Sequence, residues 1–184
     1  LKVDAVDLGG EVPGQFGGTL SWYASPRGDR EHTDGILATE AEWMLERFAR
    51  RPQQPFFLAV GFFRPHTPFV APRDPYFGWY PEEAMPLFPT LDRNPPEVPA
   101  AAMLSSKREN LAMKETQRRQ AAQAYYASIS FLDAQVGRVV EALDRLGLTD
   151  NTIIVFTSDH SYRIGEHALW QKVSLYEVCA RVPL

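Results

Sequence analysis

The stretch that decides the fold is TSDHSYRIGEHALWQK, at residues 157–172, which follows the apolar run IIVF at residues 153–156. A short, continuous apolar run is typical of a buried strand. Polar residues just after such a strand lie at its carboxyl end, where open α/β sheets bind their ligands. Asp159 and His160 are therefore expected at the rim of a sheet, as the main candidate site of the chain.

The bulk composition is that of an ordinary soluble globular domain. The 184 residues suffice for one domain with a core, and the hydrophobic fraction of 45% and charged fraction of 23% are usual values. The net charge is −4 and no basic run occurs, so nucleic acid is not an expected partner. No apolar run approaches the ~20 residues of a membrane helix. The single cysteine, Cys179, excludes an internal disulfide.

The first part of the chain predicts loops followed by a helix. Clustered Gly and Pro residues in residues 1–35 predict loop with short extended pieces. Apolar residues then recur at helical spacing from Leu37 to Phe48, and Pro52 is the expected stop. Thr33 or Asp34 is available to cap the first backbone N–H groups of this helix.

A second apolar run, PFFLAVGFF at residues 55–63, predicts a strand covered on both faces. Arg64 and His66 follow it directly. Helix, strand and then polar loop is the order typical of an α/β domain. If the runs at residues 55–63 and 153–156 are parallel neighbours, their polar ends share one rim of the sheet.

The region from residue 64 to about residue 110 is rich in proline: twelve of the 15 prolines lie between Pro52 and Pro99. Proline removes backbone donors and blocks helices, so an irregular segment is expected. Six aromatic residues between Phe69 and Phe88 argue against disorder, because disordered tracts are usually poor in aromatics. Long irregular loops in compact domains are more often binding loops, so we expect a wall of the site here.

A long helix is expected from about Lys114, because apolar residues from Tyr125 to Leu146 recur every three or four positions. Gly147 is the expected C-terminal stop. Residues 152–157 then form the second predicted strand. No repeat and no internal boundary divides the chain, so a single domain is expected.

Asp159 and His160 each have an ordinary structural interpretation, the acid as a cap or turn residue and the histidine as a packing residue. Together they offer a carboxylate oxygen and an imidazole nitrogen to one cation. Two ligands do not complete a site, since zinc takes at least three protein ligands and calcium roughly six to eight ligands. A metal here needs further ligands from outside the segment.

Three other polar residues of the stretch, Glu166, His167 and Lys172, have either a structural or a functional interpretation. For Glu166 and His167 we prefer local hydrogen bonding that shapes the loop. Lys172 is either a solvated surface lysine or a cation that neutralises an anionic substrate oxygen in the transition state. No GxSxG elbow, phosphate-binding glycine-rich loop, HExxH or CxxC pattern occurs.

Three ordered motifs resemble the type I sulfatases, with the closest likeness to iduronate-2-sulfatase-like and choline-sulfatase-like members. The motifs are TSDHSYRIGEH with WQK and ARVPL within residues 157–184, PFFLAVG with RPHTPF within residues 55–69, and YYASI through LDAQVGR within residues 125–138. The likeness runs from about His32 to the end of the chain.

The resemblance implies an alkaline-phosphatase-like α/β fold, with a mixed sheet flanked by helices, and hydrolysis of a small-molecule or carbohydrate sulfate ester at a calcium ion. The family's nucleophile is a formylglycine made from the Cys or Ser of a C/S-x-P-x-R motif. Carried over by position, Asp159 and His160 look like two calcium ligands. His66 looks like a contact to the sulfate or the leaving group, and Lys172 like the lysine that bridges sulfate and nucleophile. Ser161 stands where relatives usually have Gly.

No C/S-x-P-x-R motif occurs in the chain, and neither Ser25 nor Cys179 has the required spacing. The nucleophile is therefore expected upstream of residue 1, together with the family's first strand and its acidic metal ligands. We expect residues 1–184 to be an internal part of one sulfatase catalytic domain, incomplete at both ends and inactive alone.

Two alternatives stay open at this stage. One is a phosphodiesterase or phosphonate monoester hydrolase of the same superfamily, which shares the metal chemistry. The other is a degenerate binding module that never had the nucleophile. The resemblance leaves the compartment open among periplasmic, secreted and lysosomal locations, and the substrate is not indicated.

Overall fold

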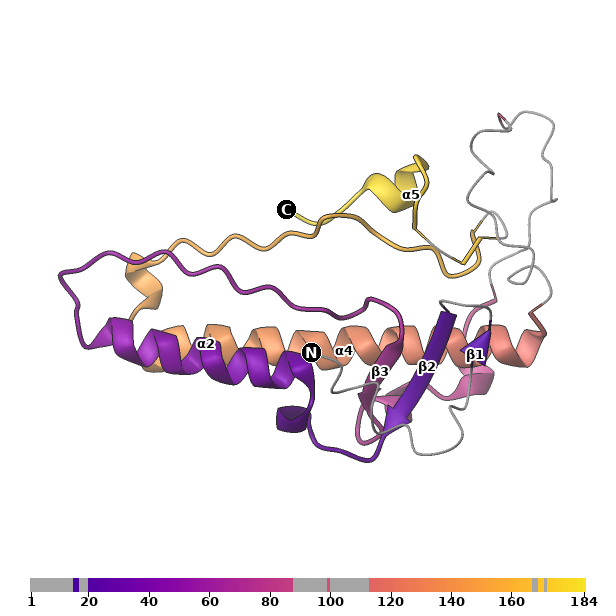
Figure 1. Cartoon of the computed structure of the whole chain (residues 1–184), viewed down its shortest axis with the longest axis horizontal. Coiled ribbons are helices and arrows are strands. Elements are labelled where there is room, and N and C mark those ends of the chain that lie inside the picture. Colours follow the sequence, from indigo (N-terminus) through magenta and orange to yellow (C-terminus); the bar gives the residue numbers. More distant parts are fainter. Residues whose placement is uncertain (1–14, 17–19, 88–98, 100–112, 167–168, 171) are drawn as a thin grey trace.

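The computed structural model describes residues 15–16, 20–87, 99, 113–166, 169–170 and 172–184. Two helices, α2 (Thr33–Ala49) and α4 (Glu115–Arg145), run side by side in the same direction, and a small sheet lies against α4 (Figure 1). The short helix α5 (Glu177–Ala180) lies near the C-terminus. Single 3-10 turns complete the regular structure: η1 (Asp29–Glu31), η2 (Phe77–Trp79), η3 (Glu82–Ala84) and η5 (Thr149–Asn151).

The sheet has the order β1-β2-β3, formed by Gln15–Phe16, Leu20–Ser25 and Phe69–Pro72. β2 and β3 are parallel, with Trp22 opposite Phe69, and β1 is antiparallel to β2. The sequence did not predict β3, because its four residues lie in the proline-rich region that we expected to be irregular. All four are buried, so this part of the region belongs to the core rather than to a site wall.

Helix α2 confirms the predicted helix but not its predicted cap. His32 occupies the N-cap position and makes no side-chain cap bond. The buried carboxylate of Asp34 instead accepts hydrogen bonds from the backbone N–H groups of Phe63 and Arg64, each at 2.9 Å. Asp34 thereby ties the start of α2 to the end of the extended segment that precedes His66.

Helix α4 also confirms its prediction, and Gly147 follows it in a left-handed conformation with φ +66°. The expected stripe of large apolar residues is confirmed in part, since Leu143 is buried but Ile129 is exposed. Most of the buried residues are small: Ala121, Ala122, Ala124, Ala127, Ser128 and Ala142, together with Phe131, Gln135 and Leu143. Small side chains let the neighbouring elements approach closely. The spacing of large apolar residues therefore did not predict this part of the buried face.

Polar contacts join α2 to α4. Arg138 donates to Glu42 at 2.8 Å and to the carbonyl oxygen of Gly35 at 3.0 Å. Asp29, just before α2, accepts hydrogen bonds from Gln135 at 2.8 Å and from the hydroxyl of Tyr76 at 2.6 Å. Burial, followed by the bond to Asp29, raises the pKa of Tyr76 above its ordinary range, so this hydroxyl stays a donor.

The two predicted strands at residues 55–63 and 152–157 are extended, but neither pairs with another strand among the residues that the structure describes. Both run in the opposite direction to the helices, on the same side of α4 in the view of Figure 1. Exposed and half-buried residues alternate along residues 55–63, which is the period of a strand. The prediction that both segments are buried was wrong for this chain, since Phe57 is 91% exposed and Ile153 is 92% exposed.

Candidate functional site

Two loops carry the residues that the sequence singled out, and each follows one of the extended segments. The first loop contains His66, which is exposed. Its Nδ1 lies 2.6 Å from the carbonyl oxygen of Thr67. A carbonyl oxygen only accepts, so Nδ1 carries the proton of this hydrogen bond. Nε2 of His66 is then the atom left for a ligand, as a lone pair on the neutral ring or as a donor on the imidazolium.

The position of this first loop is fixed by buried polar contacts. Arg64 is buried, and its Nε donates to the carbonyl oxygen of Val70 in β3 at 2.7 Å. Its backbone N–H donates to Asp34 at the start of α2. The loop that bears His66 is thus attached to both a helix and the sheet.

The second loop begins with Asp159 and His160, whose side chains face each other. Nε2 of His160 lies 3.5 Å from Oδ2 of Asp159. Nδ1 of His160 lies 2.9 Å from the carbonyl oxygen of Ser161, so Nδ1 carries a proton here as well. The lone pair of a neutral His160 is therefore on Nε2, the atom nearest the carboxylate.

The carboxylate of Asp159 is 84% exposed and ionises readily. Slight desolvation, which would raise its pKa, is outweighed by the charge of His160, by backbone N–H groups of His160 and Asp159, and by the charge of Lys172. These influences hold the pKa of Asp159 below its usual value. Lys172, half-buried, is thus electrostatically coupled to the same carboxylate.

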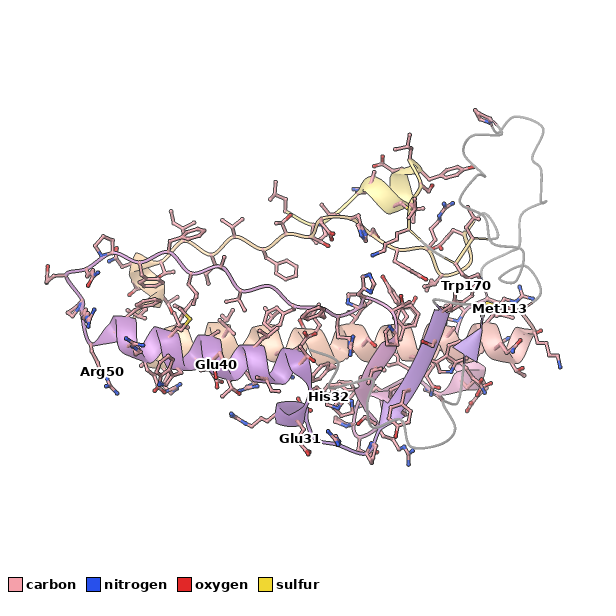
Figure 2. All side chains as sticks on the ribbon, viewed as in Figure 1. Glu31, His32, Glu40, Arg50, Met113 and Trp170 are labelled. Carbon is pink, nitrogen blue, oxygen red and sulfur yellow. The ribbon has the colours of Figure 1, made fainter. Side chains whose placement is uncertain are left out.

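Two described residues between this pair and Lys172 are anchored in the main core. Ile164 and Trp170 are each 5% exposed and pack in one cluster with Trp22 and Phe69 of the sheet. Figure 2 shows Trp170 beside Met113, which belongs to the same cluster. Ile164 and Trp170 therefore attach this loop to the core.

Aromatic contacts and local hydrogen bonds complete this anchoring. The ring of Tyr162 stacks on that of Tyr125 from α4 at a centroid distance of 6.0 Å, and its hydroxyl donates to the carbonyl oxygen of Trp170 at 3.0 Å. Burial, and then the negative charge of Glu166, raises the pKa of Tyr125 to about 12. Glu166 accepts a hydrogen bond from the backbone of Ile164 at 2.8 Å, which confirms its predicted loop-shaping role. His167 lies outside the described residues.

The predicted site residues are brought together only in part. Asp159 and His160 lie side by side and the charge of Lys172 acts on Asp159, whereas no contact joins them to His66 within the ranges that the structure describes. In the same ranges, no group of three or more His, Cys, Asp or Glu side chains is placed to hold a metal ion. Asp159 and His160 are two side chains of ligand type, without a third beside them among these residues. No helix in the described part of the chain is long and apolar enough to cross a membrane.

Likeness to a solved structure places the chain in the alkaline-phosphatase-like α/β class. The crystal structure of yidJ, a Bacteroides fragilis protein assigned as a sulfatase, matches it with a TM-score of 0.58 and 32% identity, over 82% of this chain and 30% of that one. More narrowly, the chain belongs to the sulfatase family, whose sequence model matches residues 11–184.

Individual relatives support the same family. The chain is 41% identical over 158 residues to iduronate 2-sulfatase of Mus musculus, covering 79% of this chain and 28% of the relative. It is 36% identical over 177 residues to a sulfatase of Formosa agariphila, covering 93% of this chain and 34% of the relative. The chain spans about a third of the length of the curated relatives that it matches.

Proposed function

We propose that this chain is part of the catalytic domain of a sulfatase that hydrolyses a sulfate ester with the help of a divalent cation, expected to be calcium. Asp159 and His160 would be two of the cation's ligands. Lys172 and His66 would contact the sulfate group. The observation that carries the proposal is the approach of Oδ2 of Asp159 and Nε2 of His160 to 3.5 Å.

Two acceptors that face each other repel unless a positive charge lies between them. Here the carboxylate is held ionised, and the hydrogen bond to Ser161 places the lone pair of neutral His160 on Nε2. This arrangement supports a proton or a metal ion as the positive charge shared by the two side chains. An ordered Nδ1–H bond to a carbonyl is also the usual support of a metal-bound histidine. The residues present therefore fit a metal, which when bound would stabilise negative charge on a substrate oxygen.

The remaining roles follow from charge and proton position. The ammonium group of Lys172 is coupled to Asp159, so it lies within electrostatic reach of an anion bound at the same cation. His66 has its Nδ1 proton committed to Thr67, so only Nε2 is available to donate to, or accept from, a substrate oxygen. The nucleophile, expected to be a formylglycine, would come from outside residues 1–184.

We also propose that these residues act as one part of a longer catalytic domain. Two extended segments expose apolar side chains such as Phe57 and Val155, and backbone that no described strand pairs. Exposed edges of this kind bind further strands. The alignments cover only 28% and 34% of the two relatives, which fits a domain with more chain to contribute.

The proposal is tested with the full-length gene product that contains this chain. We expect release of sulfate from an aryl sulfate, and Lys172→Ala should lower kcat by a factor of roughly 100 or more while the protein stays folded, because a positive charge at the developing anion is lost. Lys114→Ala, at an exposed position before α4, is the matched control and should keep the activity of the wild type.

Other outcomes separate the alternatives. Faster turnover of a phosphonate monoester than of the aryl sulfate would replace the sulfatase by a phosphonate hydrolase with the same site. No turnover of either ester, with the protein folded and calcium present, would favour a binding module. An unchanged kcat in Lys172→Ala would return Lys172 to the role of a surface lysine.

A further inference from the structure

Arg163 lies at the centre of the candidate loop and is the largest fully buried side chain described, with 0% exposure. Its nitrogens Nε, Nη1 and Nη2 are all buried and have no hydrogen-bond partner among the described residues. The contact that the structure records is with an aromatic ring, since Cζ lies 4.7 Å from the centroid of Tyr176. The catalytic roles proposed above do not use this residue.

A guanidinium in this position calls for an anion. Arginine keeps its charge under all ordinary conditions and presents five N–H donors. The ring of Tyr176 attracts the cation but accepts none of these N–H groups in the way an oxygen does. Burying a charge without a paired, hydrogen-bonding counterion is strongly unfavourable. The described surroundings of Arg163 therefore supply a cation without the anion that its burial requires.

The nearby acids on the same loop are engaged elsewhere. Glu166 accepts the backbone N–H of Ile164 at 2.8 Å. Asp159 faces His160 and is largely exposed to solvent. Neither forms an ion pair with Arg163.

We propose that Arg163 is the cationic half of a buried oxyanion site, whose other half is a carboxylate or sulfate group supplied from beyond the described residues. The planar guanidinium fork matches both groups, because each presents two oxygens that can accept parallel N–H bonds. Two sources can supply this chemistry: an acidic side chain of the rest of the polypeptide, or a diffusible anion. The proposal does not depend on the sulfatase activity.

The test is the melting temperature of the full-length protein, measured in sodium sulfate and in sodium chloride of equal ionic strength. The variants are Arg163→Met, which keeps most of the volume and removes the charge, and Arg163→Lys, which keeps the charge without the fork. Arg50→Met is the matched control, since Arg50 is exposed at the end of α2 and lies far from Trp170 in Figure 2.

Breaking a buried pair leaves its other charge unpaired, so Arg163→Met should lower the melting temperature by roughly 5–10 °C, with a smaller loss for Arg163→Lys. Sulfate stabilises most proteins through its exclusion from their surface, so the rise from chloride to sulfate is compared between variants. The same rise in the wild type and in Arg163→Met would identify an acidic side chain as the partner. A larger rise in the wild type and Arg50→Met than in Arg163→Met would identify a diffusible anion.

The opposite result overturns the proposal. Replacing an uncompensated buried charge by an apolar side chain stabilises a protein. If Arg163→Met melts at or above the wild-type temperature in both salts, no oxyanion is bound to Arg163. If Arg163→Met yields no folded protein, Arg163→Lys decides in the same way: a lower melting temperature supports the site, and an unchanged or higher one contradicts it.

Discussion

At the scale of single residues, hydrogen bonds to neighbouring carbonyls fix the available atom of each site histidine. His66 and His160 both carry a proton on Nδ1, which is bonded to the carbonyl of Thr67 or Ser161. The two rings nevertheless differ in role, because only His160 has a carboxylate 3.5 Å from its Nε2. The histidine with the neighbouring acid is the one suited to a cation.

Removing either member of this pair should weaken cation binding by the full-length protein. We expect Asp159→Asn and His160→Ala each to raise the dissociation constant for Ca²⁺ by roughly 10- to 100-fold or more, as loss of even supporting groups does at metal sites. Calorimetric titration measures the effect. Asp150→Asn, at an exposed position in η5, serves as the control. A nitrogen ligand suits Mn²⁺ better than Ca²⁺, so both ions belong in the titration.

The ionisation of Asp159 can be tested separately, by following its carboxyl carbon in an NMR titration of the full-length protein. Its pKa is lowered, so the carboxylate stays charged at neutral and mildly acid pH. It becomes protonated only at a pH below the usual pKa of about 3.9. The charge of His160 lowers this pKa more than that of Lys172 does. His160→Ala should therefore raise the midpoint further than Lys172→Ala, and a wild-type midpoint at or above the usual value would contradict the geometry.

At the scale of elements, the position of His66 depends on a buried carboxylate of α2. Asp34 accepts the backbone N–H groups of Phe63 and Arg64, and this is the contact that holds the end of the extended segment. Asp34→Asn keeps the shape of the side chain but offers one acceptor oxygen for two donors. We expect a loss of roughly 1–3 kcal/mol of unfolding free energy, measured by denaturant titration.

Asp34→Asn should also displace the loop that carries His66. A displaced loop should lower kcat of the full-length enzyme more than its stability loss explains, since small misplacements of a positioned group are costly in rate. Asp133→Asn, exposed on α4, is the control for a changed charge. A fully stable and active Asp34→Asn variant would show that the backbone holds the loop without this carboxylate.

The sequence predicted the elements whose signal is local. Both long helices were predicted because apolar spacing, Pro52 and Gly147 mark them along the chain. β3 was missed because its strand character comes from pairing with β2, a segment more than forty residues earlier. The hydrogen bonds that Asp34 accepts from the backbone of residues 63 and 64 were also missed, because these partners are distant in sequence. By sequence alone, an acid in the first turn of a helix has the pattern of a cap. The pair Asp159 and His160 stays a predicted site, proposed from its position after an apolar run, whereas the buried state of Arg163 depends on packing that no spacing encodes.

At the scale of the whole molecule, the largest difference between sequence and structure lies in the two extended segments. Their apolar runs are those of buried central strands, yet Phe57, Ile153 and Val155 are between 72% and 92% exposed. The half-buried side chains of the first segment do pack, as Phe56 stacks on Phe48 of α2 at 4.8 Å. The first segment thus has one face on the helices, whereas residues 153–159 are all exposed, and neither segment has a strand partner in the described chain.

Hydrogen exchange can show whether further chain covers these edges. In the 184-residue chain alone, amides of residues 56–62 and 153–156 should exchange rapidly, because no described strand accepts their N–H groups. In the full-length protein, central strands would protect the same amides by several orders of magnitude, whereas amides in the middle of α4 should be protected in both. Rapid exchange of these segments in the full-length protein, with α4 protected, would show that they are surface strands and that the longer sheet proposed here does not form.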